Sequence, residues 1–245
     1  MTKLIAYPLT VFYLIVFSLI LLIFHPIQWI CLNVFGYRAH KKSVDILNLF
    51  LVRCLHLLGV RYRFENPHQI ASNQAVIIVS NHQSMNDIPP IIWFLRKHHP
   101  KFISKKELGK GIPSVSYNLR HGGSVLIDRK QAMQSVQAIE NFAERVKKNN
   151  WGAVIFPEGS RSRDGHPRPF KTKGLLSLFR QIPNATVIPI TVNNSWKTLK
   201  YGKFPMGIGA KIEFKVHEPL MVNEHDHNTL VQHIEKQITD HIKHD

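Results

Sequence analysis

The sequence has few cysteines and few acidic side chains, and both shortages limit what the protein can be. Its 245 residues include two cysteines, Cys31 and Cys54, each in apolar surroundings. They provide neither a disulfide framework nor the thiol set of a structural zinc site. Asp and Glu number 16 against 32 Lys and Arg, which gives a net charge of +16. We therefore expect reduced thiols and an anionic partner.

Nucleic acid is one such partner, but the sequence lacks the modules that bind it. There is no zinc-finger spacing, no basic helix with heptads and no aromatic-basic strand signature. Internal repeats, low-complexity tracts and linkers are also missing, and the length suits one domain with appendages. An acidic membrane surface or an acidic substrate is favoured instead.

The N-terminal segment carries no charge over a long stretch. Residues 4–37 contain no Lys, Arg, Asp or Glu, and residues 4–24 are dense in Leu, Ile, Val and Phe. This is enough to cross a hydrocarbon core of about 30 Å as a helix. Pro26 is expected to interrupt that helix. A cleaved signal peptide fits poorly because no small-residue cleavage site follows, and membrane insertion is preferred over a buried soluble helix.

Basic residues at positions 38–42 follow this segment, whereas Lys3 alone precedes it. The positive-inside rule then places the rest of the chain on the cytoplasmic side. Residues 44–60 predict a second apolar helix, which with the first would form a hairpin that either spans the membrane or enters it from one face. We expect membrane-associated helices in residues 1–58 and a globular domain in residues 59–245.

Strand and helix patterns alternate through the globular part. Apolar or alternating runs predict strands at residues 60–64, 75–79, 101–104, 122–127, 151–156, 186–192 and 210–216. Helical spacing of apolar residues predicts helices at residues 88–95, 131–148, 173–179 and 230–242. Pro189 must lie where its strand needs no backbone donor. The alternation predicts an α/β fold, with a mixed, mostly parallel sheet flanked by helices.

A histidine and an aspartate lie in the turn after the strand at residues 75–79. His82 and Asp87 are five residues apart, so they can meet only if the chain bends between strand and helix. Asp87 would then accept a hydrogen bond from one imidazole nitrogen, which leaves the other free to take a proton from a bound hydroxyl. The substrate would supply the nucleophile. The alternative is a chance pair in which Asp87 only caps a helix.

Basic residues follow three other predicted strands: Lys105, Arg129, and Arg161 with Arg163. If those strands are parallel, their ends converge on the same edge as His82. An arginine fork matches phosphate oxygens, Gly159 permits close backbone approach, and Glu158 could accept a hydrogen bond from a ligand. The alternative is that these loops are basic only because they are solvated.

Four blocks of sequence, in order, resemble the glycerolipid acyltransferases, and most of all the 1-acyl-sn-glycerol-3-phosphate acyltransferase branch. They are residues 81–87, 127–129, 156–162 and 187–190, supported by residues 102–108 and 170–174. The resemblance covers roughly residues 60–220, and four ordered blocks are more specific than any single one. Ser160 stands where that branch usually has Thr, and both keep a hydroxyl.

The resemblance implies a role for each matching residue. His82 would be the general base and Asp87 would orient it. Substrate binding would fall to Arg129 for the acceptor's phosphate, helped by Lys105 and Arg161, and to Glu158 with Gly159 for the glycerol part. Pro189 would shape the acyl side of the site. No metal or other cofactor is implied, and the C-terminal histidines (225, 227, 233, 241 and 244) have no known ligand spacing.

The implied reaction moves a fatty acyl group from acyl-CoA or acyl carrier protein to the 2-hydroxyl of lysophosphatidate, giving phosphatidate for phospholipid biosynthesis. The expected partners are a membrane lipid acceptor, the acyl donor and an anionic membrane surface, with no nucleic acid. The expected location is a bacterial inner membrane, with the catalytic domain on the cytoplasmic side. Two alternatives stay open: another acceptor (glycerol-3-phosphate, another lysophospholipid or a lyso-aminolipid), or a non-catalytic basic membrane-binding protein.

Overall fold

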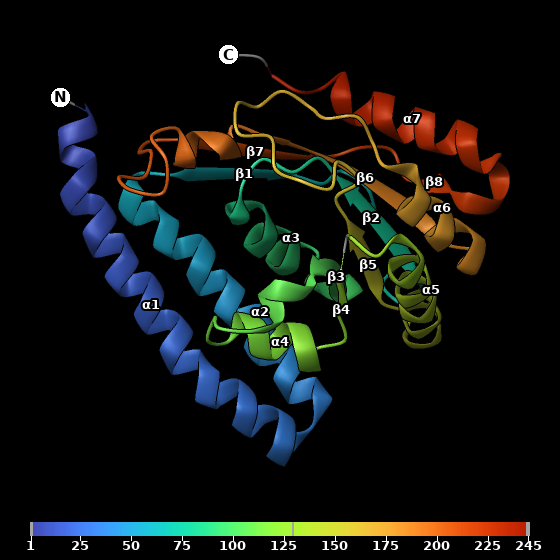
Figure 1. The fold of residues 1–245 in the computed structure, drawn as a ribbon, viewed down its shortest axis with the longest axis horizontal. Helices are drawn as coiled ribbons and strands as arrows, with labels where there is room; N and C mark the ends of the chain where they lie inside the picture. The colour runs from blue at the N-terminus through green and yellow to red at the C-terminus, as the bar shows by residue number, and fades with distance from the viewer. Residues whose placement is uncertain (1, 129, 244–245) are drawn as a thin grey trace.

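The computed structural model describes residues 2–128 and 130–243, with every side chain except that of Ala132. These residues form seven α-helices and eight strands, joined by loops and short 3₁₀ helices (Figure 1). The helices are α1 (Thr2–Phe35), α2 (Tyr37–Cys54), α3 (Ile88–Phe94), α4 (Val115–His121), α5 (Ala132–Asn149), α6 (Thr172–Gln181) and α7 (His227–Thr239). The strands are β1 (Arg61–Glu65), β2 (Val76–Ser80), β3 (Pro100–Lys105), β4 (Val125–Ile127), β5 (Gly152–Ile155), β6 (Thr186–Asn193), β7 (Lys211–Val216) and β8 (Leu220–Met221).

The strands make one mixed sheet in the order β1-β7-β6-β2-β5-β3-β4, with β8 pairing to β6. Strands β2, β3, β4, β5 and β6 run parallel to one another, whereas β7 and β8 are antiparallel to β6. The predicted mixed, mostly parallel sheet is therefore confirmed. The carboxyl ends of the five parallel strands lie at the same edge of the sheet.

Helices cover both faces of the sheet, as expected for an α/β fold. Helices α5, α6 and α7 pack on one face around a core that includes Ile155, Leu178 and Ile234. On the other face α1, α2 and α3 pack around a second core that includes Val76, Ile91 and Ile188. In Figure 1 the hairpin of α1 and α2 lies at the left, and α5 and α6 lie at the right.

Strand β2 occupies the centre because its sequence suits burial on both faces. All five of its residues are buried, and the first four are β-branched Val or Ile in a continuous apolar run. Its neighbour β6 is also wholly buried and contains Pro189. That proline lies between the β8 and β7 pairings of β6, and its carbonyl accepts from the His217 N–H at 2.9 Å. Its missing donor therefore falls where β6 has no ladder partner on that side, as predicted.

The hairpin differs from its prediction in two details. Pro26 does not interrupt the first helix, since α1 continues from Thr2 to Phe35. A proline removes one backbone hydrogen bond, and this long helix tolerates that loss. The interruption comes at Gly36, whose φ of 79° lies in the left-handed region, and α2 begins directly after it. Helix α4 and strand β8 were not predicted, and β4 is shorter than expected.

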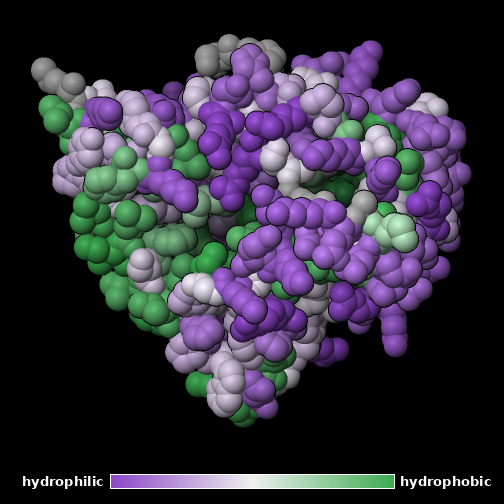
Figure 2. Space-filling view, viewed as in Figure 1, coloured by the Kyte–Doolittle hydropathy of each residue, from purple (hydrophilic) through white to green (hydrophobic). Residues whose placement is uncertain are grey.

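Among the described helices, α1 is the one long and apolar enough to cross a membrane, with a mean hydropathy of 2.4 over its best window and 17% of that window buried. Its apolar side chains form the green region at the left of Figure 2, while most of the remaining visible surface is hydrophilic. Helix α2 is different, because Val44 packs with α3 in the core of the globular part. The division at residue 58 stays a prediction.

Candidate active site

The turn after β2 has the bend that the sequence requires. His82 lies two residues beyond Ser80, the last residue of β2, at the carboxyl edge of the parallel strands. A short 3₁₀ helix, Met85–Asp87, follows and leads into α3, whose first turn contains two prolines. Ser84 caps this turn, and its Oγ accepts from the Asn86 N–H at 3.0 Å. The local sequence therefore bends the chain and returns Asp87 toward His82.

The two side chains are hydrogen-bonded. His82 Nδ1 lies 2.8 Å from Asp87 Oδ2. The same oxygen accepts from the backbone N–H groups of Gln83 (2.8 Å) and Ser84 (2.9 Å), and the Asp87 side chain is fully buried. Because a carboxylate accepts, Nδ1 is the donor, and Nε2 is left with its lone pair. The His82 side chain is 13% exposed, so a ligand can contact the ring.

A second layer of polar groups supports this turn from the segment after β6. Ser195 Oγ lies 2.5 Å from Ser84 Oγ, and the Ser195 N–H donates to Gln83 Oε1 at 3.0 Å. Asn86 Nδ2 donates to Thr198 Oγ1 at 2.9 Å. These partners lie 111 and 112 residues apart in sequence. No local sequence pattern could have identified Ser195 and Thr198, because only the β2–β6 pairing brings them to the turn.

Asn81 connects the same two elements. Its Nδ2 donates to the Val192 carbonyl at 2.9 Å, and its Oδ1 accepts from the Val192 N–H at 2.7 Å. The side chain therefore continues the β2–β6 pairing past the end of the strand. It fixes the backbone from which the next residue, His82, projects.

The loop after β5 covers His82. The Phe156 ring stacks on the imidazole, with ring centroids 4.1 Å apart and planes at 18°. The Ser162 N–H donates to the His82 carbonyl at 2.7 Å. Gly159 has a φ of 71°, which lets this loop turn sharply beside the histidine. Phe156 belongs to one of the resembling blocks, but no sequence pattern predicted that its ring would stack on His82.

Glu158 is the second buried carboxyl group of the site. Its Oε1 accepts from the His82 N–H at 3.1 Å, and the residue is 2% exposed. Burial raises the pKa of Glu158 to about 7, although the backbone N–H groups of His82 and Arg168 act in the opposite direction. Its Oε2 has no hydrogen-bond partner among the described residues. A ligand hydroxyl near that oxygen would meet an open acceptor or, below pH 7, a donor.

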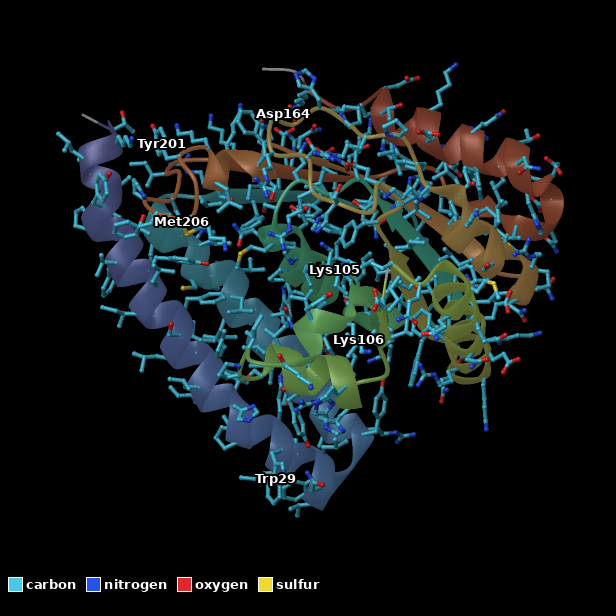
Figure 3. All side chains as sticks on the ribbon, viewed as in Figure 1. Trp29, Lys105, Lys106, Asp164, Tyr201 and Met206 are labelled. Carbon is cyan, nitrogen blue, oxygen red and sulfur yellow. The ribbon has the colours of Figure 1, made fainter. Side chains whose placement is uncertain are left out.

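The structure describes two of the three cations that were predicted to bind phosphate. Lys105 ends β3, and Arg161 directly precedes Ser162, so both follow strands at the edge that holds His82. Both are exposed. Figure 3 labels Lys105 where β3 ends, and Asp164 in the loop between β5 and α6. Arg129 lies outside the described residues, so its predicted contact with phosphate stays a prediction.

The described residues contain no group of three or more His, Cys, Asp or Glu that could hold a metal ion. The chemistry that their geometry offers is acid–base. An imidazole oriented by a buried carboxylate can take a proton from a hydroxyl and return it to a leaving group. Basic side chains at the same edge would favour an anionic substrate.

Comparison with known proteins gives the family. The family model described as Acyltransferase matches residues 61–193 of this chain. The 1-acyl-sn-glycerol-3-phosphate acyltransferase alpha of Ovis aries is 27% identical over 154 residues, 62% of this chain and 52% of that protein. The beta form of Homo sapiens is 26% identical over 172 residues, or 70% and 61%. This chain thus spans about half the length of these curated relatives.

A solved structure shows the same fold. The crystal structure of the 1-acyl-sn-glycerophosphate (LPA) acyltransferase PlsC from Thermotoga maritima superposes with a TM-score of 0.78. The match covers 98% of this chain and 95% of that one, at 22% sequence identity. At this identity the likeness establishes the arrangement of the sheet, its covering helices and the N-terminal hairpin.

Proposed function

The chain belongs to the acyltransferase family, and from this premise we propose that it transfers a fatty acyl group from a thioester to the 2-hydroxyl of 1-acyl-sn-glycerol-3-phosphate. The product is phosphatidic acid. The observation that carries the proposal is the 2.8 Å hydrogen bond between His82 Nδ1 and the buried Asp87 carboxylate. The names of the curated relatives support the choice of acceptor.

The reaction follows from the state of the imidazole. His82 Nε2 removes the proton from the acceptor hydroxyl as its oxygen attacks the thioester carbonyl carbon. The new C–O bond forms and the C–S bond breaks. The imidazolium then returns the proton to the departing thiolate, which leaves as a thiol. Asp87 stabilises the imidazolium while the proton resides there, and no acyl-enzyme is formed.

The acceptor's charge accounts for the basic residues at the same edge. Lys105 and Arg161 support binding of its phosphate group, with Arg129 the predicted third cation. The open Oε2 of Glu158 supports an interaction with a glycerol oxygen, beside Gly159. In this proposal these residues bind the acceptor, and His82 and Asp87 act on its hydroxyl.

The acceptor is a membrane lipid, and the exposed apolar surface of α1 supports attachment to a bilayer. The net charge of +16 supports attraction to anionic headgroups. We propose that the catalytic domain lies on the cytoplasmic side of a bacterial inner membrane and uses acyl-CoA or acyl carrier protein. The proposed mechanism uses no metal.

The test uses the full chain in membranes, supplied with palmitoyl-CoA and a panel of acceptors. We expect thiol release with 1-acyl-sn-glycerol-3-phosphate, and at least tenfold less with glycerol-3-phosphate or an uncharged lysolipid. His82→Ala should reduce transfer by about a thousandfold or more, because the general base is lost. His233→Ala, on the exposed side of α7, is the control and should keep full activity.

A preference for another acceptor would keep the enzyme but overturn its substrate. Thiol release that survives in His82→Ala would overturn the mechanism. No thiol release with any acceptor would favour a non-catalytic membrane-binding protein.

A further inference from the structure

A basic and aromatic loop lies beside the N-terminal end of α1, away from the residues given a catalytic role. It consists of residues 200–204, between β6 and β7, and is called the lysine loop below. Lys200 and Lys203 are exposed, and Phe204 is 52% exposed. Figure 3 labels Tyr201 of this loop beside the first turns of α1. Exposed rings among lysines are typical of protein surfaces that meet the headgroup layer of a membrane.

The lysine loop contacts α1 directly. The Tyr7 and Phe204 rings meet edge to face, with centroids 5.4 Å apart. The Lys3 ammonium lies 5.7 Å from the Tyr201 ring centroid, and the Lys200 ammonium lies 4.8 Å from the same centroid. Lys3 and Tyr7 are four residues apart, so they share one face of α1. The loop and the first turns of α1 therefore form one continuous surface.

This surface carries positive charge that the two segments cannot neutralise. Residues 2–44 and 194–212 contain no Asp or Glu. Lys3, Lys200 and Lys203 form no ion pair within the part of the chain that the structure describes. Two ammonium groups that converge on one tyrosine ring repel each other. An anion from outside the chain would relieve that repulsion.

Apolar side chains beside the lysines indicate where the anion comes from. Leu4 and Ile5 in the first turns of α1 are 73% and 56% exposed, and the exposed Phe204 ring lies next to this end of the helix. A soluble anion such as inorganic phosphate gains nothing from these side chains. A bilayer of anionic lipids offers phosphate groups at its surface and hydrocarbon just below them.

Hydrogen bonds fix the segment that carries the loop to both α1 and the catalytic turn. The Met206 N–H donates to Thr10 Oγ1 of α1 at 2.9 Å. The Gly207 N–H donates to the Thr198 carbonyl at 2.8 Å. Thr198 Oγ1 in turn accepts from Asn86 Nδ2 at 2.9 Å. A headgroup held by the lysine loop therefore has a defined position relative to the catalytic turn.

We propose that the lysine loop and Lys3 bind the phosphate groups of anionic lipids at a bilayer surface, while Phe204 enters the layer just below. This contact is separate from the acceptor site at His82 and adds to the apolar attachment of α1. The inference rests on the proposed attachment to a bilayer and does not depend on the proposed reaction. Its effect is to set the position of the catalytic edge above the membrane.

The test compares two pairs of lysines that carry the same charge. The purified full chain is sedimented with vesicles of phosphatidylcholine, either alone or mixed with phosphatidylglycerol, in the absence of donor and acceptor. Changing Lys200 and Lys203 together to Gln should weaken partition onto the anionic vesicles at least tenfold. Changing Lys147 and Lys148 together to Gln, at the exposed end of α5, is the matched control and should weaken it less than threefold. Partition onto neutral vesicles should stay within twofold for both pairs.

Two results would overturn the proposal. Equal losses in both lysine pairs would show that net charge alone attracts the protein. Unchanged partition of the loop variant would show that its lysines do not face the bilayer. The difference between wild type and the loop variant should also disappear in about 1 M salt, where charges are screened within about 3 Å. A difference that persists there would contradict the electrostatic contact.

The aromatic part and the source of the anion are tested separately. Phe204→Ser should weaken partition onto both kinds of vesicle at least threefold, whereas Met133→Ser, at a side chain that is 87% exposed on α5, should not. Equal effects of the two changes would contradict insertion of Phe204. Calorimetric titration with inorganic phosphate, without vesicles, should show no saturable binding. Saturable binding that the loop variant loses would assign the lysines to a soluble phosphate and overturn the lipid contact.

An activity measurement links the contact to the proposed reaction. With lysophosphatidate in anionic vesicles, the loop variant should raise the acceptor KM at least fivefold without lowering kcat. With the same acceptor in uncharged detergent, its KM should equal that of wild type. A fall in kcat with normal vesicle binding would contradict a role in membrane contact alone. If the wild type shows no acyl transfer, the proposed function fails, and the sedimentation result still decides the lipid contact.

Discussion

Two buried polar clusters in this protein differ in whether their polar groups have hydrogen-bond partners. The catalytic cluster, defined here as His82, Asp87 and Glu158 with their hydrogen-bond partners, lies at the carboxyl edge of the parallel strands. The junction cluster lies at the amino end of β3, where α2 meets the sheet. It consists of Lys101, Asp45, His40, His98 and His99. Both clusters hold titratable groups that are buried or half-buried.

Burial shifts the pKa of groups in both clusters. It raises that of Glu158 to about 7, and it lowers those of His40, His98 and His99 to about 4, helped by nearby cations. It also lowers the pKa of Lys101 to about 7. A search for shifted pKa values would therefore have selected both clusters equally.

The catalytic cluster and the junction cluster differ in their hydrogen bonding. Asp87 Oδ2 accepts from three donors and fixes one imidazole in place. In the junction cluster both ring nitrogens of His40 and of His98 are buried without a hydrogen-bond partner among the described residues. Oriented donors and acceptors, and not burial alone, indicate where proton transfer is organised.

The largest expected difference between the clusters comes from a matched pair of aspartates. Asp87→Asn removes the charge that stabilises the imidazolium and offers one fewer acceptor to three donors. We expect kcat/KM to fall by about a hundredfold or more. Asp45→Asn changes the other buried aspartate, which accepts from Lys41 at 2.5 Å. It should leave kcat/KM within about threefold of wild type, because Asp45 lies on α2, beside the amino end of β3 and away from the edge that holds His82.

Steady-state acyl transfer measures both variants, with thermal unfolding to show that each is folded. Comparable activity losses in two folded variants would contradict the contrast. Loss of activity in Asp87→Asn through unfolding alone would leave His82→Ala as the deciding variant.

The sequence predicted most of what local pattern controls. The apolar runs of β2 and β6, the helical spacing of α5 and the bend between His82 and Asp87 are all found in the structure. Each depends on neighbours within a few residues, where strand period, helix period and capping act directly. The mixed sheet followed from the alternation of these elements.

What the sequence did not reveal depends on contacts between distant segments. Ser195 and Thr198 become part of the site only because β6 pairs with β2. The Phe156 ring looked like one more apolar residue at a strand end, and only the fold of its loop places it on His82. The junction cluster was not predicted either, since Asp45 and Lys101 lie 56 positions apart in the sequence and meet only because α2 packs on the sheet.

The next effect concerns Glu158 and the stability of the catalytic cluster. Its pKa rises from 4.5 to about 7 on folding, so between these values the unfolded chain releases a proton that the folded chain keeps. The stabilising contribution is complete below pH 4.5 and is lost as pH rises through 7. Glu158→Gln removes this dependence, and its stability relative to wild type should rise by about 2–3 kcal/mol across the window.

Thermal unfolding of membrane-free protein in detergent, at several pH values, measures this difference. Glu144→Gln, on the exposed side of α5, controls for the loss of one negative charge. A constant difference between Glu158→Gln and wild type across the window would show that the carboxyl is already ionised in the folded protein.

The smallest expected effect is in the junction cluster and concerns Lys101. Its ammonium lies 5.2 Å from the Tyr37 ring and 5.1 Å from the Trp151 ring. Burial lowers the pKa of Lys101 from 10.5 to about 7, and the nearby Lys41 adds to this. Between these values the unfolded chain holds a proton that the folded chain lacks, so stability falls as pH decreases from 10.5 to 7.

Lys101→Met should therefore be more stable than wild type near pH 7, with a difference of about 1–2 kcal/mol, because the two rings offset part of the burial cost. The difference should shrink as pH rises toward 10.5, while acyl transfer stays within about twofold of wild type. Unfolding midpoints between pH 7 and 10.5 measure this stability difference. Lys106→Met, on the surface near the end of β3, is the control. A destabilised Lys101→Met at pH 7 would contradict this prediction, because Tyr37, Trp151 and Asp45 would then stabilise the buried cation by more than its burial costs.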